Sequence, residues 1–251
     1  MRLDNYLVEK GFFESRTKAK QSIERGEVLI DNKLINKPSF DIQVDCEVKL
    51  VYDSLFVSLG GFKLEKALND FGIDVNGLIV ADIGASTGGF TDCLLKRGAK
   101  NVFAVDLRDD LLHQTLKSNS KVKMVVKNAK ELSLSDFDMD LDMIVADLSF
   151  ISVKSVLPIF HNLLRDGKKA IILIKPQFET GRKTRYKNGI VRDQKVHQTV
   201  CREVYDFAIS CNLAPQGFTI APLVSGKNKE FLILLEKGGE VKLSRSFYSE
   251  L

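Results

Sequence analysis

From residue 78 onward, the sequence alternates short apolar runs with segments of helical periodicity. Strands that alternate with helices are typical of a parallel, doubly wound α/β sheet. No helical segment separates the last two runs, so we expect them to form an antiparallel hairpin at one edge of the sheet. The pattern predicts seven strands, at residues 78–83, 101–106, 122–126, 141–147, 170–175, 217–222 and 231–236.

The first 50 residues predict a separate, small α/β domain. Gly11 ends a first helical stripe, Ser15 caps a second helix, and Gly26 ends that helix. Short apolar runs around residues 28–35 and 48–50 predict strands. The resulting division is a small domain at residues 1–50, a linker at 51–59, a larger domain at 60–238 that opens with a helix at about 62–71, and a frayed polar tail at 239–251.

Composition excludes several classes of protein. The four cysteines, Cys46, Cys93, Cys201 and Cys211, contain no C-x-x-C pair, so we expect buried thiols in a reducing cytosol and no metal site. No apolar run is long enough to span a bilayer, and the N-terminus has no signal-peptide core. We therefore expect a cytoplasmic protein without a membrane partner. The net charge of +4 permits a nucleic-acid partner without requiring one.

The segment Val80–Thr91 indicates the cofactor, because an apolar strand runs into a glycine-rich turn and then a helix. A dinucleotide motif would require glycine at position 86, which is Ser86, and a phosphate loop would require lysine after Gly88. The pattern D-x-G-x-x-x-G-G instead resembles the first motif of S-adenosylmethionine-dependent methyltransferases. That cofactor has no phosphate, and it needs glycines only so that the backbone can approach it.

Ten residues around this turn are candidate contacts of S-adenosylmethionine. Asp106, 24 positions after Asp82, ends the second strand and is placed to accept hydrogen bonds from ribose hydroxyls, although a strand-end turn residue is the alternative. Asn128 either faces the adenine edge or is an ordinary loop amide. The candidates are Asp82, Gly84, Ser86, Gly88, Gly89, Phe90, Asp106, Leu107, Asn128 and Asp147.

Four charged residues are candidates for catalysis. Asp147 and Lys175 each end a predicted strand, Glu230 opens another, and Lys63 precedes the sheet. A lysine at the end of an apolar run costs desolvation free energy unless it has a partner. For Lys63 and Glu230 alone, an ordinary surface ion pair is the alternative interpretation.

These residues resemble one enzyme family, one RNA-binding motif and one further family that joins the two. Lys63, Asp147, Lys175 and Glu230 match in order the K-D-K-E tetrad of RNA ribose 2′-O-methyltransferases of the FtsJ type. The pattern R-L-D-x-x-L-x-x-x-G-x-x-x-S-R-x-x-A at residues 2–19 resembles the alpha-L RNA-binding motif. The strings G-G-F-K-L-E-K-A-L, A-D-L-S-F-I-S and I-K-P-Q-F-E are similar to the TlyA family, which joins both parts. Leu59 departs from it, because that family commonly has arginine there.

The resemblance implies methyl transfer to a ribose 2′-hydroxyl, with cytidine as the target, in ribosomal RNA or ribosomal subunits. Lys175 would be the general base, because burial and a nearby cation such as Lys63 lower the pKa of a lysine. Asp147 would orient the amine of Lys175, and Glu230 would balance charge and position the ribose. The expected RNA contacts are Arg2, Arg16, Lys18, Lys20, Arg182 and Lys187, for which a solvated basic face or loop is the alternative.

Two other functions compete with this one. The chain could be a non-catalytic RNA-binding factor for ribosome assembly, although an intact tetrad and Asp82 turn argue against that. It could also be a secreted haemolysin, since members of the TlyA family are often labelled haemolysin A. The absence of a signal peptide and of a spanning segment argues against secretion.

Overall fold

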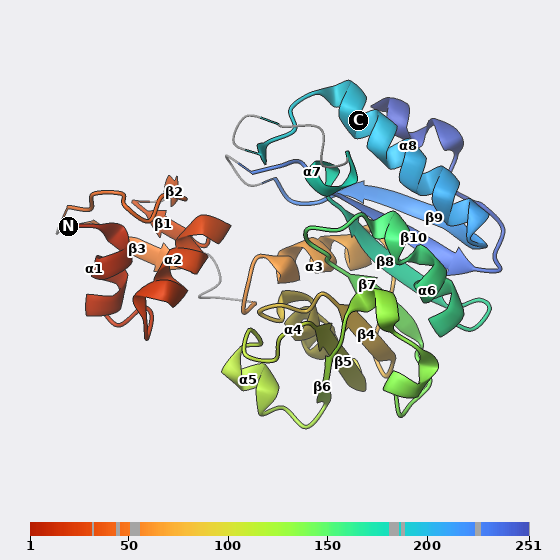
Figure 1. Ribbon diagram of the computed structural model, residues 1–251, viewed down its shortest axis with the longest axis horizontal. Coiled ribbons are helices and arrows are strands. Elements are labelled where there is room, and N and C mark those ends of the chain that lie inside the picture. Colours follow the sequence, from red (N-terminus) through yellow and green to blue (C-terminus); the bar gives the residue numbers. More distant parts are fainter. Residues whose placement is uncertain are drawn as a thin grey trace. The chain divides into compact units, whose positions relative to one another are not determined.

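The computed structural model describes residues 1–31, 33–43, 46–50, 56–180, 186, 189–223 and 227–250. The chain divides into two compact units, Met1–Leu59 and Gly60–Leu251 (Figure 1). Each unit has its own hydrophobic core. Within the described residues, no helix has the length and apolarity needed to cross a bilayer.

The N-terminal unit packs two helices against a small antiparallel sheet of strand order β2-β1-β3. Its elements are α1 (Leu3–Glu9), α2 (Arg16–Arg25), β1 (Val28–Ile30), β2 (Lys33–Ile35) and β3 (Val48–Leu50). As predicted, the Ser15 hydroxyl caps α2 by accepting a hydrogen bond from Lys18 N, and Gly26 ends the helix at a φ of 73°. Leu3, Leu7 and Ile23 are fully buried in its core.

The C-terminal unit contains a seven-stranded sheet of order β6-β5-β4-β7-β8-β10-β9. The first five strands in this order pair in parallel, and β10 pairs antiparallel with both β8 and β9. The doubly wound sheet and the edge hairpin predicted from the sequence are therefore confirmed. The strands are β4 (Ile79–Ile83), β5 (Asn101–Asp106), β6 (Val122–Val126), β7 (Met143–Ala146), β8 (Lys169–Ile174), β9 (Leu213–Ile220) and β10 (Phe231–Lys237).

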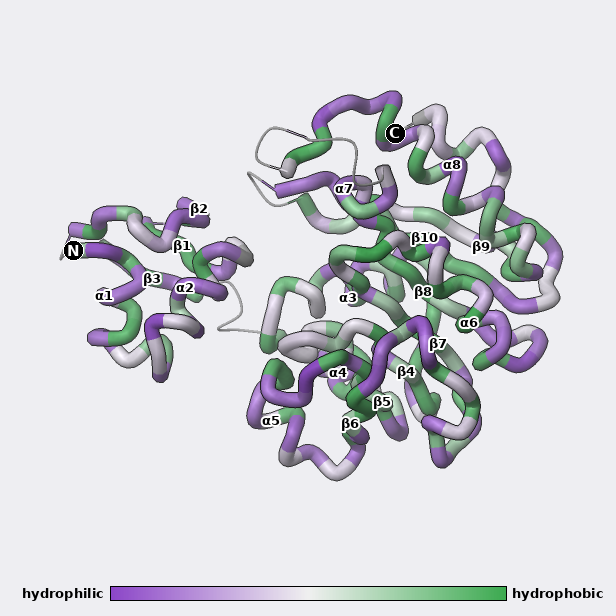
Figure 2. Tube along the Cα trace, in the orientation of Figure 1, coloured by the Kyte–Doolittle hydropathy of each residue, from purple (hydrophilic) through white to green (hydrophobic). Residues whose placement is uncertain are grey.

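Helices cover both faces of this sheet. The α-helices are α3 (Gly60–Phe71), α4 (Gly89–Lys96), α5 (Gln114–Lys117), α6 (Leu157–Leu163), α7 (Pro176–Glu179) and α8 (Gln194–Ser210). Alternate residues of β8, such as Ile172 and Ile174, pack in one core with Phe160 of α6 and Val204 of α8. Figure 2 shows the central strands as the most hydrophobic part of the trace, which matches their burial on both faces.

Some predicted boundaries were wrong. The strand predicted at 217–222 begins at Leu213 instead, because a register irregularity at Leu234 and Leu235 lets β9 keep pairing past Pro215. The tail expected to fray contains a 3₁₀ helix at Arg245–Glu250. The Phe247 ring lies 4.5 Å from that of Phe218, so aromatic packing anchors a segment whose composition is otherwise polar.

Candidate active site

Strand ends converge at one edge of the large sheet. Asp147 follows β7 and Lys175 follows β8, and these strands are parallel. Glu230 precedes β10, whose first residue Phe231 pairs with Ile174 at the end of β8. The antiparallel course of β10 therefore brings its beginning to the edge where the parallel strands end.

The four side chains of the predicted tetrad lie together at this edge. Lys63 Nζ, from the first turn of α3, lies 2.6 Å from Glu230 Oε2 and 3.8 Å from Asp147 Oδ2. Lys175 Nζ lies 2.5 Å from Asp147 Oδ1. The charges alternate along a chain from Glu230 through Lys63 and Asp147 to Lys175, and no side chain in it is more than 20% exposed. Such burial is compatible with ionised groups because each has an opposite partner.

The electrostatics of the tetrad keep Lys63 and Asp147 charged. Burial acts to lower the pKa of Lys63, but the carboxylates of Asp147 and Glu230 outweigh it and hold that pKa above its ordinary value. Burial likewise acts to raise the pKa of Asp147, but Lys175 and Lys63 hold it below its ordinary value. Lys63 is therefore a fixed cation and Asp147 a fixed anion at neutral pH.

Lys175 has a further contact that the sequence analysis did not identify. Its Nζ donates a hydrogen bond to Ser149 Oγ at 2.8 Å, and it lies 5.9 Å from the ring centroid of Phe178. Ser149 stands two positions after Asp147, and in extended backbone such residues share a side. That spacing was the available signal for Ser149.

A cavity of about 390 Å³ adjoins Asp147. Its size falls in the usual range for small-molecule sites. The segment after β7, residues 148–151, forms part of its wall. Six of the predicted cofactor contacts line it, namely Gly84, Ser86, Asp106, Leu107, Asn128 and Asp147.

Asp106 and Asn128 each make hydrogen bonds to the protein backbone. Asp106 Oδ2 accepts from Ser86 N at 2.8 Å, and its Oδ1 accepts from Leu107 N at 2.7 Å. The carboxylate thus holds the glycine-rich turn, and its remaining lone pairs can accept from a ligand. Asn128 Oδ1 accepts from Lys130 N at 3.0 Å, so this side chain caps a 3₁₀ turn at the cavity wall.

Four predicted cofactor residues are not among the described residues that line this cavity: Asp82, Gly88, Gly89 and Phe90. At Gly88, a Cβ atom would overlap the side chains of Leu112 and Leu116, and φ is +96°. This glycine therefore allows close packing of Leu112 and Leu116 beneath the turn, and its contact with the cofactor stays a prediction. Gly89 and Phe90 begin α4 and are buried.

Asp82 is a fully buried carboxyl group beneath the same turn. Its Oδ2 accepts a hydrogen bond from Thr91 Oγ1 at 2.6 Å. Burial raises the pKa of Asp82 to about 7, against the opposing effect of the Thr91 hydrogen bond and with a smaller contribution from the negative charge of Asp147. This hydrogen bond is internal to the protein, and the predicted contact of Asp82 with the cofactor stays a prediction.

The basic side chains predicted to bind RNA are paired with carboxylates within the N-terminal unit. Arg2 Nη2 and Arg16 Nε lie 2.9 Å and 3.0 Å from Asp4 Oδ2. The side chain of Asp4 is 2% exposed, and its hydrogen bond with Arg2, more than that with Arg16, lowers its pKa to about 2. Both arginines remain about half exposed, so their other N–H groups stay accessible.

The other basic candidates differ in environment. Lys18 pairs with Glu14, and Lys20 Nζ lies 3.8 Å from Glu24 Oε1, both on the exposed surface. Such exposed pairs contribute little to stability and are easily exchanged for phosphate contacts. Arg182 and Lys187 lie outside the described residues.

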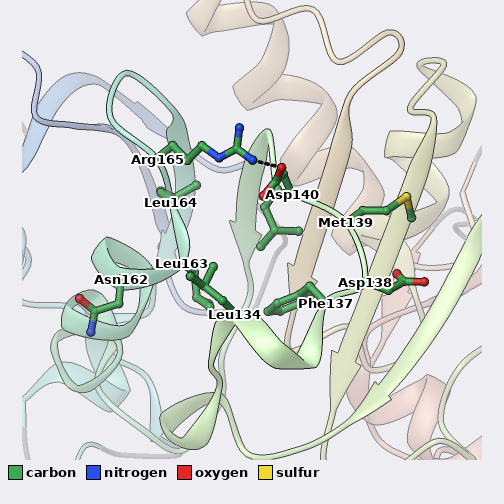
Figure 3. A pocket seen from close by; sticks show the side chains of 10 residues that line it. Leu134, Phe137, Asp138, Met139, Asp140, Asn162, Leu163, Leu164 and Arg165 are labelled. Carbon is green, nitrogen blue, oxygen red and sulfur yellow. Dashed lines mark ion pairs between the residues drawn. The ribbon is translucent and has the colours of Figure 1, made fainter.

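A second cavity, of about 340 Å³, lies at the opposite edge of the sheet, where β7 and β8 begin (Figure 3). Arg165 and Asp140 form an ion pair in its wall, so its main charges neutralise each other. None of the predicted site residues lines it. Among the described residues, no group of three or more His, Cys, Asp or Glu side chains is arranged to hold a metal ion.

Comparisons with known proteins agree with this geometry. Residues 56–237 match the model of the FtsJ-like methyltransferase family, and residues 1–48 match that of the S4 domain. The chain is 40% identical to "Putative rRNA methyltransferase YqxC" of Bacillus subtilis, over 95% of this chain and 86% of that protein.

Two further similarities cover most of the chain. It is 37% identical to "16S/23S rRNA (cytidine-2′-O)-methyltransferase TlyA" of Mycobacterium tuberculosis, over 78% of this chain and 74% of that protein. A solved structure titled "Putative hemolysin from Streptococcus thermophilus" superposes with a TM-score of 0.77 at 36% identity, covering 100% of this chain and 94% of that one. The chain therefore belongs to the FtsJ-like methyltransferase family, and it is an enzyme whose methyl donor is S-adenosylmethionine.

Proposed function

We propose that this enzyme methylates the ribose 2′-hydroxyl of a cytidine in ribosomal RNA, with Lys175 as general base. The observation that carries the proposal is the chain of alternating charges from Glu230 to Lys175, in which Asp147 also lines the cavity. The names of two relatives, an rRNA methyltransferase and an rRNA (cytidine-2′-O)-methyltransferase, support the substrate.

The lining of the cavity suits S-adenosylmethionine. Asp106 would accept hydrogen bonds from the ribose hydroxyls of the cofactor, and Leu107 and Ile151 offer apolar surface for adenine. Asp147 adds negative charge near a ligand that carries a positive sulfonium and a positive amino group. When bound, S-adenosylmethionine supplies a methyl group that its sulfur releases while keeping the bonding electron pair.

Lys175 would remove the proton that makes the 2′-hydroxyl a poor nucleophile. Lys175 would first release the proton of its ammonium form to solvent; as the 2′-oxygen then forms its bond to the methyl carbon, the hydroxyl proton passes to the amine of Lys175, which becomes an ammonium group again. Asp147, in contact with Lys175 at 2.5 Å, holds the amine in place and stabilises the ammonium as it forms. Catalysis of this kind also depends on holding the attacking oxygen, the methyl carbon and the leaving sulfur in one line.

Lys63 and Glu230 would set the charge of the site. Lys63 is a fixed cation beside Asp147, so that carboxylate divides its electrostatic interaction between Lys63 and Lys175. Glu230, at 2.6 Å from Lys63, balances this second cation. Glu230 would therefore act on Lys175 indirectly, through Lys63 and Asp147, and its role would be to balance the charge of Lys63.

Phe150 would hold the base of the target nucleotide. It lines the cavity, is 87% exposed and has a φ of 68°, an unfavourable conformation for a bulky side chain. Its ring centroid lies 5.2 Å from that of Phe178, whose ring also faces Lys175. Exposed aromatic rings stack on unpaired bases, so we infer that the target nucleotide is unpaired when methylated.

The S4 domain would supply affinity for structured RNA through the exposed faces of Arg2, Arg16, Lys18 and Lys20. Positive side chains on one small domain neutralise phosphates and position the substrate without reading its bases. We therefore propose ribosomal RNA or a ribosomal subunit as the partner.

The test is transfer of a tritiated methyl group from the cofactor to ribosomal RNA, followed by alkaline hydrolysis. A 2′-O-methyl group blocks cleavage of the adjacent phosphodiester bond, so we expect the label in an alkali-resistant dinucleotide with cytidine at its 5′ side. Label in ordinary mononucleotides would place the methyl group on a base and refute the 2′-hydroxyl as target. RNA binding without any transfer, at saturating cofactor, would favour a non-catalytic assembly factor.

A further inference from the structure

We propose that Ser149 is a positioning residue for Lys175: its hydroxyl fixes the rotation of the lysine amine so that the nitrogen lone pair faces the target 2′-hydroxyl. The inference rests on the proposed function, in which Lys175 is the base. It concerns a residue outside the Lys63–Asp147–Lys175–Glu230 tetrad.

The geometry provides two fixed partners for one nitrogen. Lys175 Nζ lies 2.5 Å from Asp147 Oδ1 and donates to Ser149 Oγ at 2.8 Å. A neutral amine has two N–H bonds and one lone pair in a tetrahedral arrangement. The hydrogen bond to Ser149 fixes one N–H direction, and the ion-pair contact with Asp147 attracts the other N–H to its side, so the lone pair is restricted to the remaining direction. With Asp147 alone, the amine can still rotate about its Cε–Nζ bond.

Ser149 also lies where the substrate must approach. It is exposed and lines the cavity, whereas Lys175 is buried. Lys175 is further restricted by the Phe178 ring at 5.9 Å. Ser149 therefore contacts the buried Lys175 and also faces the open cavity.

Ser149 is an uncharged partner in a charged environment. Lys175 faces Asp147 directly, and beyond Asp147 stand Lys63, Glu230 and the buried Asp82, whose charge is coupled to that of Asp147. Removing the Ser149 hydroxyl deletes one hydrogen bond and leaves this set of charges unchanged. Because that bond favours the ammonium form, its loss should let the lysine release its proton at lower pH.

The proton balance follows from the same contacts. During transfer, the 2′-hydroxyl proton moves to Nζ along the lone-pair direction, and the resulting ammonium keeps its ion-pair contact with Asp147 and its hydrogen bond to Ser149. The third N–H bond then loses its proton to solvent, which restores the neutral amine before the next turnover.

The test compares Ser149→Ala and Ser149→Thr with wild type, and uses Ser210→Ala on α8 as the matched control. Single-turnover rates are measured against pH at saturating cofactor and RNA, and cofactor affinity by calorimetry. The Lys175 Nζ signal is titrated by ¹⁵N NMR in the protein without RNA, and assigned with Lys175→Arg.

We expect Ser149→Ala to lower the plateau rate about 10- to 100-fold and to move the acid limb of the profile down by about half a unit to one unit. The NMR midpoint should move in the same direction, because the ammonium has lost an acceptor. Ser149→Thr, which keeps the hydroxyl, should restore most of the rate and the wild-type midpoint. Ser210→Ala should behave as wild type.

A lower plateau rate without any shift of the acid limb of the pH–rate profile or of the NMR midpoint would indicate a merely structural role. That result would overturn the proposal. So would a wild-type profile for Ser149→Ala. If Ser149→Ala does not fold, Ser149→Cys provides a weaker acceptor in the same place, and its midpoint must lie below that of wild type. Lys175→Ala is run in parallel: its activity would refute the base itself, whereas its inactivity beside a normal Ser149→Ala would refute only the role of Ser149.

Discussion

Gly84 and Asp147 lie so close, at the ends of the neighbouring strands β4 and β7, that a Cβ atom on residue 84 would stand 2.6 Å from the carbonyl oxygen of Asp147. The partner atom is backbone, and it belongs to the residue that holds Lys175. The position of the turn after β4 therefore constrains the position of the end of β7, and the end of β7 constrains that turn.

Gly84→Ala should consequently separate these strand ends. Gly72 has a comparable positive φ, +62°, but a Cβ atom there would meet nothing within 4 Å. Both substitutions incur the backbone penalty of about 1–3 kcal/mol, but only Gly84→Ala adds a steric clash. We expect chemical denaturation to show the larger loss of unfolding free energy for Gly84→Ala, together with loss of cofactor binding in calorimetry. Equal losses in the two variants would contradict the close approach.

Asp82 should make stability depend on pH. Because its folded-state pKa is about 7 and its unfolded value is 3.8, the folded state holds the proton more tightly. The unfolding free energy should therefore fall as pH rises from about 4 to about 7, by on the order of 4 kcal/mol at most, and then level off.

Asp82→Asn should remove this component, since its amide oxygen can still accept the Thr91 hydrogen bond but cannot ionise. The measurement is urea denaturation at pH 5, 6, 7 and 8. Asp109→Asn, at an exposed position, is the control and should retain the wild-type dependence. If Asp82→Asn and wild type show parallel pH profiles, Asp82 is ionised in the folded protein at pH 5.

Asp147→Ala should cost more activity than Glu230→Ala. Asp147 contacts both lysines, at 2.5 Å and 3.8 Å, whereas Glu230 contacts Lys63 alone. We expect single-turnover rates to fall about 10²- to 10⁴-fold for Asp147→Ala, as for loss of a general base, and much less for Glu230→Ala. The reverse order would mean that charge balance at Lys63 matters more than orientation of Lys175.

The RNA surface of the S4 domain can be tested at Lys20, whose partner Glu24 is distant at 3.8 Å. Lys20→Ala should weaken RNA binding and make the plot of log affinity against log salt shallower by about 0.7–0.9, the contribution of one phosphate contact. Lys121→Ala, an exposed lysine where β6 begins, is the control. An unchanged slope for Lys20→Ala would exclude a phosphate contact at this residue.

Much of the site could be predicted because strand ends are visible in the sequence. The apolar runs before Asp147 and Lys175 end where the strands end, and parallel topology brings such ends to one edge. The pairing of Lys63 with Glu230 required the tetrad resemblance, since their separation in sequence predicts nothing about contact.

Other features depend on packing that a local pattern does not encode. The close packing of the Leu112 and Leu116 side chains against Gly88 is one such feature. The spacing of Ser149 from Asp147 hints at a shared side, but its hydrogen bond with Lys175 depends on the position of Lys175 Nζ, which no local pattern gives. The 3₁₀ helix at Arg245–Glu250 is held by the contact of the Phe247 ring with Phe218, on a strand that is distant in sequence.

The most direct test of the account is the single-turnover rate of Lys175→Ala with cofactor and ribosomal RNA both bound, measured beside Lys121→Ala. Lys175 is buried against Asp147, so its removal should abolish transfer, by about 10²- to 10⁴-fold or more, while both ligands still bind. Lys121→Ala should transfer methyl groups at the wild-type rate. A near-normal rate for Lys175→Ala, with RNA and cofactor bound, would contradict the assignment of Lys175 as the general base.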